Sequence, residues 1–284
     1  MLTYEVTKKD DKKTLGKYLE KQHLSRKSMT TLKHRGGCIA VNEKPQTTRY
    51  PLQTGDRVRL TFPKEPISPT LFPVDMTLDV VYEDAFLIVL NKDAGLLSVP
   101  NRHQAPSLAH GILAHYARSN TSSTVHFVNR LDQNTSGLLV VAKYRHIHDL
   151  MTRDTTHIVR KYDAIVEGQL HTAGEIDAPI WQPDHTHIKR RIDPRGQTAR
   201  THYQPIEIRQ NQTRVLCTLK TGRTHQIRVH LAHLGHPILK DPLYGNGSGT
   251  DQQLLHSSHL EFTHPISGEK LRFSTNLPER FDWK

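Results

Sequence analysis

The fold of this chain is decided around one loop, which reads Arg130-Leu131-Asp132-Gln133-Asn134-Thr135-Ser136-Gly137. The loop leads directly into an apolar run at 137–142 that is typical of a buried strand. A carboxylate in a polar turn, followed by two small hydroxyl residues and a glycine, can be held at a sheet edge while a ligand approaches the backbone. An ordinary hairpin connection, in which Asp132 and Asn134 bind nearby amides, is the alternative.

The segments around this loop show the patterns of both strands and helices. Strand-like apolar runs cover residues 86–90, 137–142, 162–166 and 214–219. Helical patterns cover residues 107–117, 145–153 and 224–234. We therefore expect an α+β fold whose central sheet is mixed and mainly antiparallel. The sequence has no G-x-G-x-x-G and no Walker loop, so it gives no support to a nucleotide cofactor.

A second motif, at residues 221–231, couples a tight turn to a helix. Thr224 is the expected N-cap, and Ile227 and Leu231 belong to the buried stripe. Arg223 would stand just before the helix N-terminus, where free amides and the helix dipole suit a carboxylate or a phosphate. A structural ion pair of Arg223 is the alternative.

The histidines of this region lack the spacing of a zinc site. Four of them follow one another at intervals of five, three and three residues: His225, His230, His233 and His236. The i, i+4 pair of H-E-x-x-H sites is missing, and no cysteine pair is near. We expect no metal, and we expect both cysteines to be reduced thiols because they lie far apart in the chain.

The net charge of the 284-residue chain is +11, and most of the excess lies at one end. Residues 1–70 hold 15 Lys and Arg against 7 Asp and Glu, hence +8, whereas residues 71–284 hold 24 against 21, hence +3. A small basic module on a nearly neutral body indicates a polyanionic partner, although excess charge can also serve solubility alone. No run approaches the roughly 18 apolar residues of a membrane span, and the N-terminus has no signal-peptide core. We expect a cytoplasmic protein without membrane contact.

The basic module reads as a strand, two short helices and a hairpin. Alternating residues predict strands at 2–6, 38–41 and 57–62, and helical spacing covers 15–22 and 26–33, with Ser25 as the second N-cap and Gly36-Gly37 as the stop. Prolines at 63, 66, 69 and 73 predict an extended linker. We therefore divide the chain into a module at 1–66, a linker at 67–79 and a body at 80–284.

This module resembles the alpha-L RNA-binding domain of ribosomal-type proteins. The resemblance rests on three segments: Leu24-Ser25-Arg26-Lys27-Ser28, Val41-Asn42-Glu43-Lys44-Pro45 and Thr54-Gly55-Asp56-Arg57-Val58. It implies that one helix surface meets RNA phosphates through Arg26, Lys27, Lys33 and Arg35. A solvated basic face is the alternative.

The body resembles the RluA family of pseudouridine synthases across roughly residues 80–278. The motifs of that family occur here in order at 91–96, 130–139, 160–168, 199–203, 221–231 and 255–265. Three positions depart from the pattern: Asn129 replaces a common His, Asp93 a Pro and Lys240 a Gly. These departures leave the choice of substrate and the packing beneath the loop open.

The resemblance implies isomerisation of uridine to pseudouridine within structured RNA, with ribosomal RNA favoured over transfer RNA. Asp132 would act at the ribose, either by attacking carbon 1′ or by removing the proton from carbon 2′, on a base flipped out of its stack. Arg223 would pair with Asp132, and Tyr162 would lie against the uracil. Weaker RNA contacts are expected from Arg130, Lys161, His225 and Arg228.

No cofactor is needed for this reaction, and the resemblance implies a monomer. Two other classes stay open at this point. One is a non-catalytic RNA-binding or ribosome-assembly protein with the same fold, and the other is a metal-dependent RNA hydrolase, which the lack of a ligand cluster disfavours.

Overall fold

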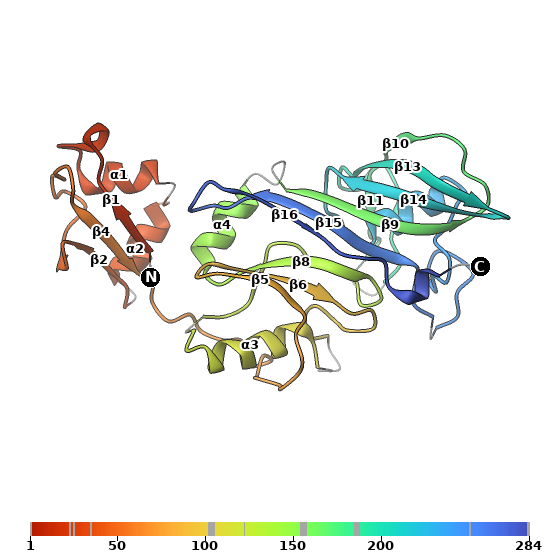
Figure 1. The fold of residues 1–284 in the computed structure, drawn as a ribbon, viewed down its shortest axis with the longest axis horizontal. Helices are drawn as coiled ribbons and strands as arrows, with labels where there is room; N and C mark the ends of the chain where they lie inside the picture. Colours follow the sequence, from red (N-terminus) through yellow and green to blue (C-terminus); the bar gives the residue numbers. More distant parts are fainter. Residues whose placement is uncertain are drawn as a thin grey trace. The chain divides into compact units, whose positions relative to one another are not determined.

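The computed structural model describes residues 2–22, 24, 26–34, 36–101, 106–121, 123–153, 158–184, 188–249 and 251–282. The chain divides into two compact units (Figure 1): residues 1–68 with 120–124, and residues 69–119 with 125–284. The division at 68/69 falls inside the predicted linker. Residues 69–79 belong to the second unit, where Val74 N–H donates to the His110 carbonyl and Leu78 packs against the core.

The first unit is a four-stranded antiparallel sheet with two helices. Its elements are β1 (Leu2–Glu5), α1 (Leu15–Lys21), α2 (Arg26–His34), β2 (Cys38–Val41), β3 (Lys44–Pro45) and β4 (Arg57–Thr61), and the strand order is β1-β4-β2-β3. Val58 and Leu60 of β4 are fully buried, as are Leu15 and Leu19 of α1. Gly36, at φ 85°, follows α2 as expected. The predicted cap Ser25 lies outside the described residues.

The second unit is built on a ten-stranded sheet. Its main order is β10 (Gly174–Asp177), β13 (Arg200–Arg209), β14 (Gln212–Leu219), β9 (Val159–Glu167), β15 (Leu255–Thr263), β8 (Ser136–Ala142), β6 (Leu87–Lys92) and β5 (Val80–Glu83). β16 (Lys270–Ser274) pairs with β15, and β7 (His126–Phe127) pairs with β8. Within the described residues β8 and β15 are parallel and the other pairings are antiparallel, which confirms the predicted mixed, mainly antiparallel α+β sheet.

Three helices pack with this sheet: α3 (Leu108–Arg118), α4 (Arg145–Arg153) and α5 (Gln226–His233). The core includes Ile112 and Tyr116 of α3, Ile227 and Leu231 of α5 and Leu139 of β8. A separate pair of short strands, β11 (Ile180–Trp181) and β12 (Arg191–Ile192), follows β10. No helix in the described parts of the chain is long and apolar enough to cross a membrane.

Gly137 fixes how β8 meets β15. It lies opposite Ser257 in the parallel pairing and has φ 107°. A Cβ at this position would overlap the backbone of Ser257. Glycine is therefore required where the loop of residues 130–136 turns into the sheet.

Candidate active site

A cleft of about 730 Å³ opens beside the loop of residues 130–136. Its walls come from residues 97–99, 127–135 and 219–228, together with side chains of β9. These segments are far apart in the sequence, and the sheet brings them together. Asp132, Tyr162 and Arg223 all line this cleft, as do Arg130, His225 and Arg228.

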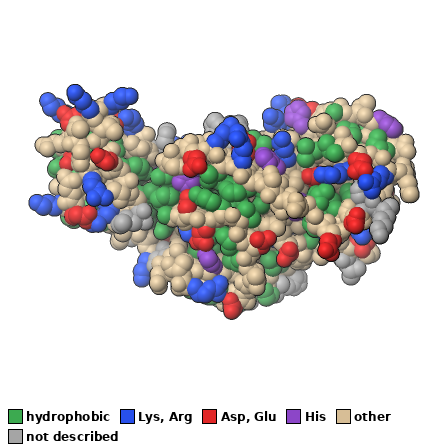
Figure 2. All heavy atoms as spheres, in the orientation of Figure 1, with side chains coloured by type: hydrophobic (Ala, Val, Ile, Leu, Met, Phe, Trp, Pro, Cys, Tyr) green, Lys and Arg blue, Asp and Glu red, His purple; other side chains and the backbone are tan. Residues whose placement is uncertain are grey.

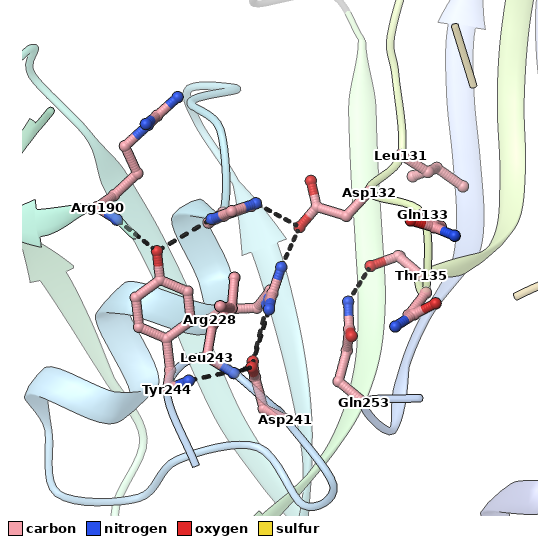
Figure 3. Close-up of polar contacts among 12 residues, drawn as sticks. Leu131, Asp132, Gln133, Thr135, Arg190, Arg228, Asp241, Leu243, Tyr244 and Gln253 are labelled. Atoms are coloured by element: carbon pink, nitrogen blue, oxygen red, sulfur yellow. Dashed lines mark hydrogen bonds and ion pairs between the residues drawn. The ribbon is translucent and has the colours of Figure 1, made fainter. Parts of the chain in front are cut away.

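The carboxylate of Asp132 is held by Arg228 (Figure 3). Arg228 Nη1 donates to Asp132 Oδ2 over 3.0 Å. The Asp132 side chain keeps 24% of its surface exposed, whereas that of Arg228 keeps only 5%. The carboxylate thus reaches the cleft while the guanidinium that holds it stays buried in the protein.

A second, fully buried carboxylate holds Arg228 in place. Asp241 accepts hydrogen bonds from Arg228 Nε at 2.7 Å and Nη2 at 2.8 Å, and from the backbone N–H groups of Leu243 and Tyr244. Burial opposes the charge of Arg228, but the hydrogen bonds that it donates to Asp241, together with the negative charges of Asp132 and Asp241, prevail and raise the pKa of Arg228. Burial likewise opposes ionisation of Asp241, and Arg228 nevertheless lowers the pKa of Asp241. The guanidinium is therefore a fixed cation that still has an Nη1 donor to offer to Asp132.

The partner of Asp132 differs from the one predicted. Arg223 is exposed, and its Nε donates to the Thr198 carbonyl over 3.1 Å. Helix α5 begins at Gln226, and its N-cap is His225 at φ 58° rather than Thr224. Arg228 lies in the first turn of the helix and contacts Asp132, whereas Arg223 lies on the turn before the helix.

His225 links this ion pair to Tyr244. Its Nε2 lies 3.9 Å from Asp132 Oδ2, and its Nδ1 lies 3.0 Å from the Tyr244 hydroxyl. Burial lowers the pKa of His225, which favours the neutral ring. The Tyr244 oxygen accepts from the backbone N–H of Arg190 and can donate its own proton to Nδ1. In that tautomer the N–H of His225 lies on Nε2, on the side of Asp132.

Tyr162 stands on β9 with its side chain buried in the cleft wall. Burial raises its pKa, so the phenol stays protonated at neutral pH. Lys161, the neighbouring residue that we predicted as an RNA contact, is absent from the cleft lining, whereas Arg160 and Tyr162 line it. The reason is the period of two in a strand, which turns Lys161 to the opposite face.

Two loops are held together beneath Asp132. Lys92 Nζ donates to the carbonyls of Asp93, Leu96 and Gln133 at 2.7 to 2.9 Å. In addition, Ser98 Oγ donates to the Leu131 carbonyl over 2.7 Å. Sequence reasoning assigned no role to these residues, because each acts on backbone carbonyls that no local pattern marks.

The three residues that depart from the family pattern differ in burial and in backbone conformation. Asn129 is buried, its Oδ1 accepts from Val140 N–H over 2.9 Å, and its Nδ2 has no hydrogen-bond partner in the part of the chain that the structure describes. Lys240 has φ 58°, a conformation that glycine adopts more readily. Asp93 is exposed at the start of the loop that Lys92 holds.

The basic residues predicted on the first unit are only partly described. Arg26 and Lys27 begin α2, but their side chains lie outside the described residues, as does all of Arg35. Lys33 is exposed, and its Nζ donates to Thr48 Oγ1 over 3.0 Å. Figure 2 shows Lys and Arg side chains spread over the face of this unit that is drawn.

Comparison with known proteins settles what kind of fold surrounds this cleft. The family model described as RNA pseudouridylate synthase matches residues 86–233, which include the Asp132 loop, β9 and α5. The chain belongs to the RNA pseudouridylate synthase family. The family model and the relatives together identify it as an RNA pseudouridine synthase.

Two relatives show how far the similarity of this synthase extends. The RNA pseudouridine synthase YjbO of Bacillus subtilis is 39% identical over 274 residues, covering 94% of this chain and 96% of that protein. Ribosomal large subunit pseudouridine synthase D of Neisseria meningitidis serogroup A is 34% identical and covers 89% of this chain and 72% of that protein.

Among solved structures, the human RNA pseudouridylate synthase domain containing 4 is similar to this synthase with a TM-score of 0.54 and 27% identity, over 71% of this chain and 89% of that one. The human domain containing 1 has a TM-score of 0.57 at 24% identity, over 70% and 83% of the two chains, and shows the shared fold.

Proposed function

We propose that this synthase isomerises uridines in structured ribosomal RNA, in preference to transfer RNA, with Asp132 as the catalytic residue. The observation that carries the proposal is the ion pair of Asp132 with Arg228, because it presents one oriented carboxylate in a cleft of nucleotide size. Preference for ribosomal RNA is supported by relatives from several bacteria that are named large-subunit synthases. By the same argument the enzyme works in the cytoplasm, where ribosomal RNA is made.

The reaction exchanges one bond to the ribose for another. The bond from uracil nitrogen 1 to ribose carbon 1′ breaks, carbon 5 is joined to carbon 1′, the proton on carbon 5 leaves, and nitrogen 1 gains a proton. Asp132 acts at the ribose while Arg228 keeps its carboxylate in place. The neutral Tyr162 contacts the flipped base in the cleft. Atoms and electrons balance without a cofactor, so we propose that the enzyme uses neither a metal nor a nucleotide.

The first unit is proposed to bind the RNA on which the second unit acts. A pair of short helices on a four-stranded sheet, together with the charge of +8 in residues 1–70, supports the resemblance to an alpha-L module. Because both parts are present in one chain, we propose that a monomer is sufficient for activity.

The test is release of tritium from RNA labelled at uracil carbon 5. The wild-type protein should release tritium into water without cutting the RNA, whereas Asp132→Asn should release none. The control is Asp149→Asn, the same change on the exposed face of α4 outside the cleft, which should match the wild type. Cleaved RNA would indicate a hydrolase, and binding without tritium release by the wild type would indicate a non-catalytic protein.

A further inference from the structure

Arg160 is a buried cation that the ion-pair network around Asp132 does not use. It lies on β9, and only 8% of its surface is exposed. Its Nε is buried with no hydrogen-bond partner, and within the described residues no carboxylate forms an ion pair with it. Burial of a guanidinium without a counter-charge costs desolvation free energy. An anionic ligand that binds beside Arg160 would offset this cost.

The guanidinium of Arg160 faces the cleft beside a glycine. Arg160 and Gly222 both line the cleft, and a Cβ on Gly222 would lie 2.8 Å from Arg160 Nη1. The turn before α5 therefore has no side chain where the guanidinium rests against it. Gly222 does not have positive φ, so the reason for a glycine here is space rather than backbone conformation.

The charges along this wall favour an anion. Among the described residues, the Lys and Arg side chains that line the cleft are Arg130, Arg160, Lys220, Arg223 and Arg228, and the one lining carboxylate is Asp132. That carboxylate is engaged by Arg228. An RNA strand brings one anionic group into such a cleft with every nucleotide, and a guanidinium fork matches the oxygens of a phosphate.

We propose that Arg160, seated against Gly222, binds one backbone phosphate next to the uridine that is isomerised. The proposal rests on the proposed function, because the bound strand is its substrate. Arg160 stands two residues before Tyr162, and both side chains line the cleft. The phosphate would thus be fixed beside the base that Tyr162 contacts, and this contact would place the ribose against Asp132.

The probe is fluorescein-labelled pentauridylate, whose binding needs no turnover. Arg160→Met should weaken its binding by about tenfold or more, since a hydrogen-bonded charge is lost. Gly222→Ala should weaken it similarly, because the new methyl displaces the guanidinium while the charge is kept. The control Arg145→Met removes an exposed arginine of α4 and should change the affinity little.

The phosphate itself is identified by replacing each phosphate of the probe in turn with a neutral methylphosphonate. For the wild-type protein, the methylphosphonate at one position should lower the affinity for the probe by about tenfold or more. For Arg160→Met, the methylphosphonate at that position should cause no further loss of affinity. Thermal unfolding separates binding from structure: Arg160→Met should keep or raise the midpoint, because an uncompensated buried charge is removed.

The proposal is overturned if Arg160→Met lowers the midpoint of thermal unfolding while leaving the affinity for pentauridylate unchanged. It is also overturned if the same methylphosphonate weakens binding to Arg160→Met as much as it weakens binding to the wild type. Absence of pentauridylate binding by the wild type would overturn it as well. Probe binding needs no turnover, so a failure of tritium release leaves the phosphate assignment standing, and a failed phosphate assignment leaves the isomerase standing.

Discussion

The difference between Arg228 and Arg223 can be measured by the same substitution at both positions. Arg228→Lys removes the fork that joins Asp241 to Asp132, and a lysine cannot span both carboxylates. We expect tritium release to fall by about 10²-fold or more. Arg223→Lys keeps an exposed charge whose Nε contacts only the Thr198 carbonyl, so its rate should stay near that of the wild type.

The opposite ranking would contradict the assignment of Arg228 as the residue that positions Asp132. Melting temperatures should accompany both rates, because Arg228 is buried and Arg223 is exposed. A loss of rate in Arg228→Lys that is regained with added Asp241→Glu would show that the two side chains act as a pair.

The residues that carry the site were predicted unevenly from the sequence. Asp132 and Tyr162 occupy the motif positions from which we predicted them as site residues, and the structure places both in one cleft. Arg223 was predicted as the partner of Asp132, whereas Arg228 forms the ion pair in the structure. Both arginines lie in the same motif, and the contact that fixes Arg228 on Asp241 has no local sequence signal.

The two loops around Lys92 give a prediction about pH. Burial lowers the pKa of Lys92 to about 7, whereas an unfolded chain leaves it at about 10.4. Between these values the unfolded state binds more protons, so this residue makes the free energy of unfolding increase with pH. Lys92→Met should remove that contribution, which is at most about 1.4 kcal/mol per pH unit.

The measurement is urea unfolding of both proteins at pH values from 7 to 9. The free energy of unfolding of the wild type should rise relative to that of Lys92→Met across this range. A difference between the two free energies that stays constant with pH would contradict the lowered pKa of Lys92. Tritium release should also fall by about tenfold or more in Lys92→Met, because the loop that carries Asp132 loses the hydrogen bonds through which Lys92 joins it to the loop of residues 93–96.

Among the elements, strands with continuous apolar runs were predicted well. The run at 137–142 became β8, buried along its whole length, and 214–219 became most of β14. β13 was missed as a strand because it has no continuous apolar run and Pro205 interrupts its pattern at a bulge. The parallel pairing of β8 with β15 joins segments far apart in the chain, and no local pattern specifies it.

For the whole chain, charge and composition indicated a small basic part joined to a larger body. The structure divides the chain at 68/69, close to the predicted boundary at 66. The predicted linker was too long because prolines exclude helix but do not exclude packing. Leu71 and Leu78 pack against the core of the second unit.

The division of labour between the two units predicts what removal of residues 1–66 will do. The truncated protein should bind structured RNA more weakly, because most of the net charge lies in residues 1–70. Each lost phosphate contact should reduce the slope of log K against log salt by roughly 0.7 to 0.9, so the slope should fall by several units. Tritium release should persist at saturating RNA, since Asp132, Arg228 and Asp241 all remain.

A cooperative thermal transition is the control for folding of the truncated protein. A folded truncation with unchanged affinity and slope would show that the basic residues of the first unit are only a solvated surface, and a folded truncation inactive at saturating RNA would show that the first unit takes part in the chemistry.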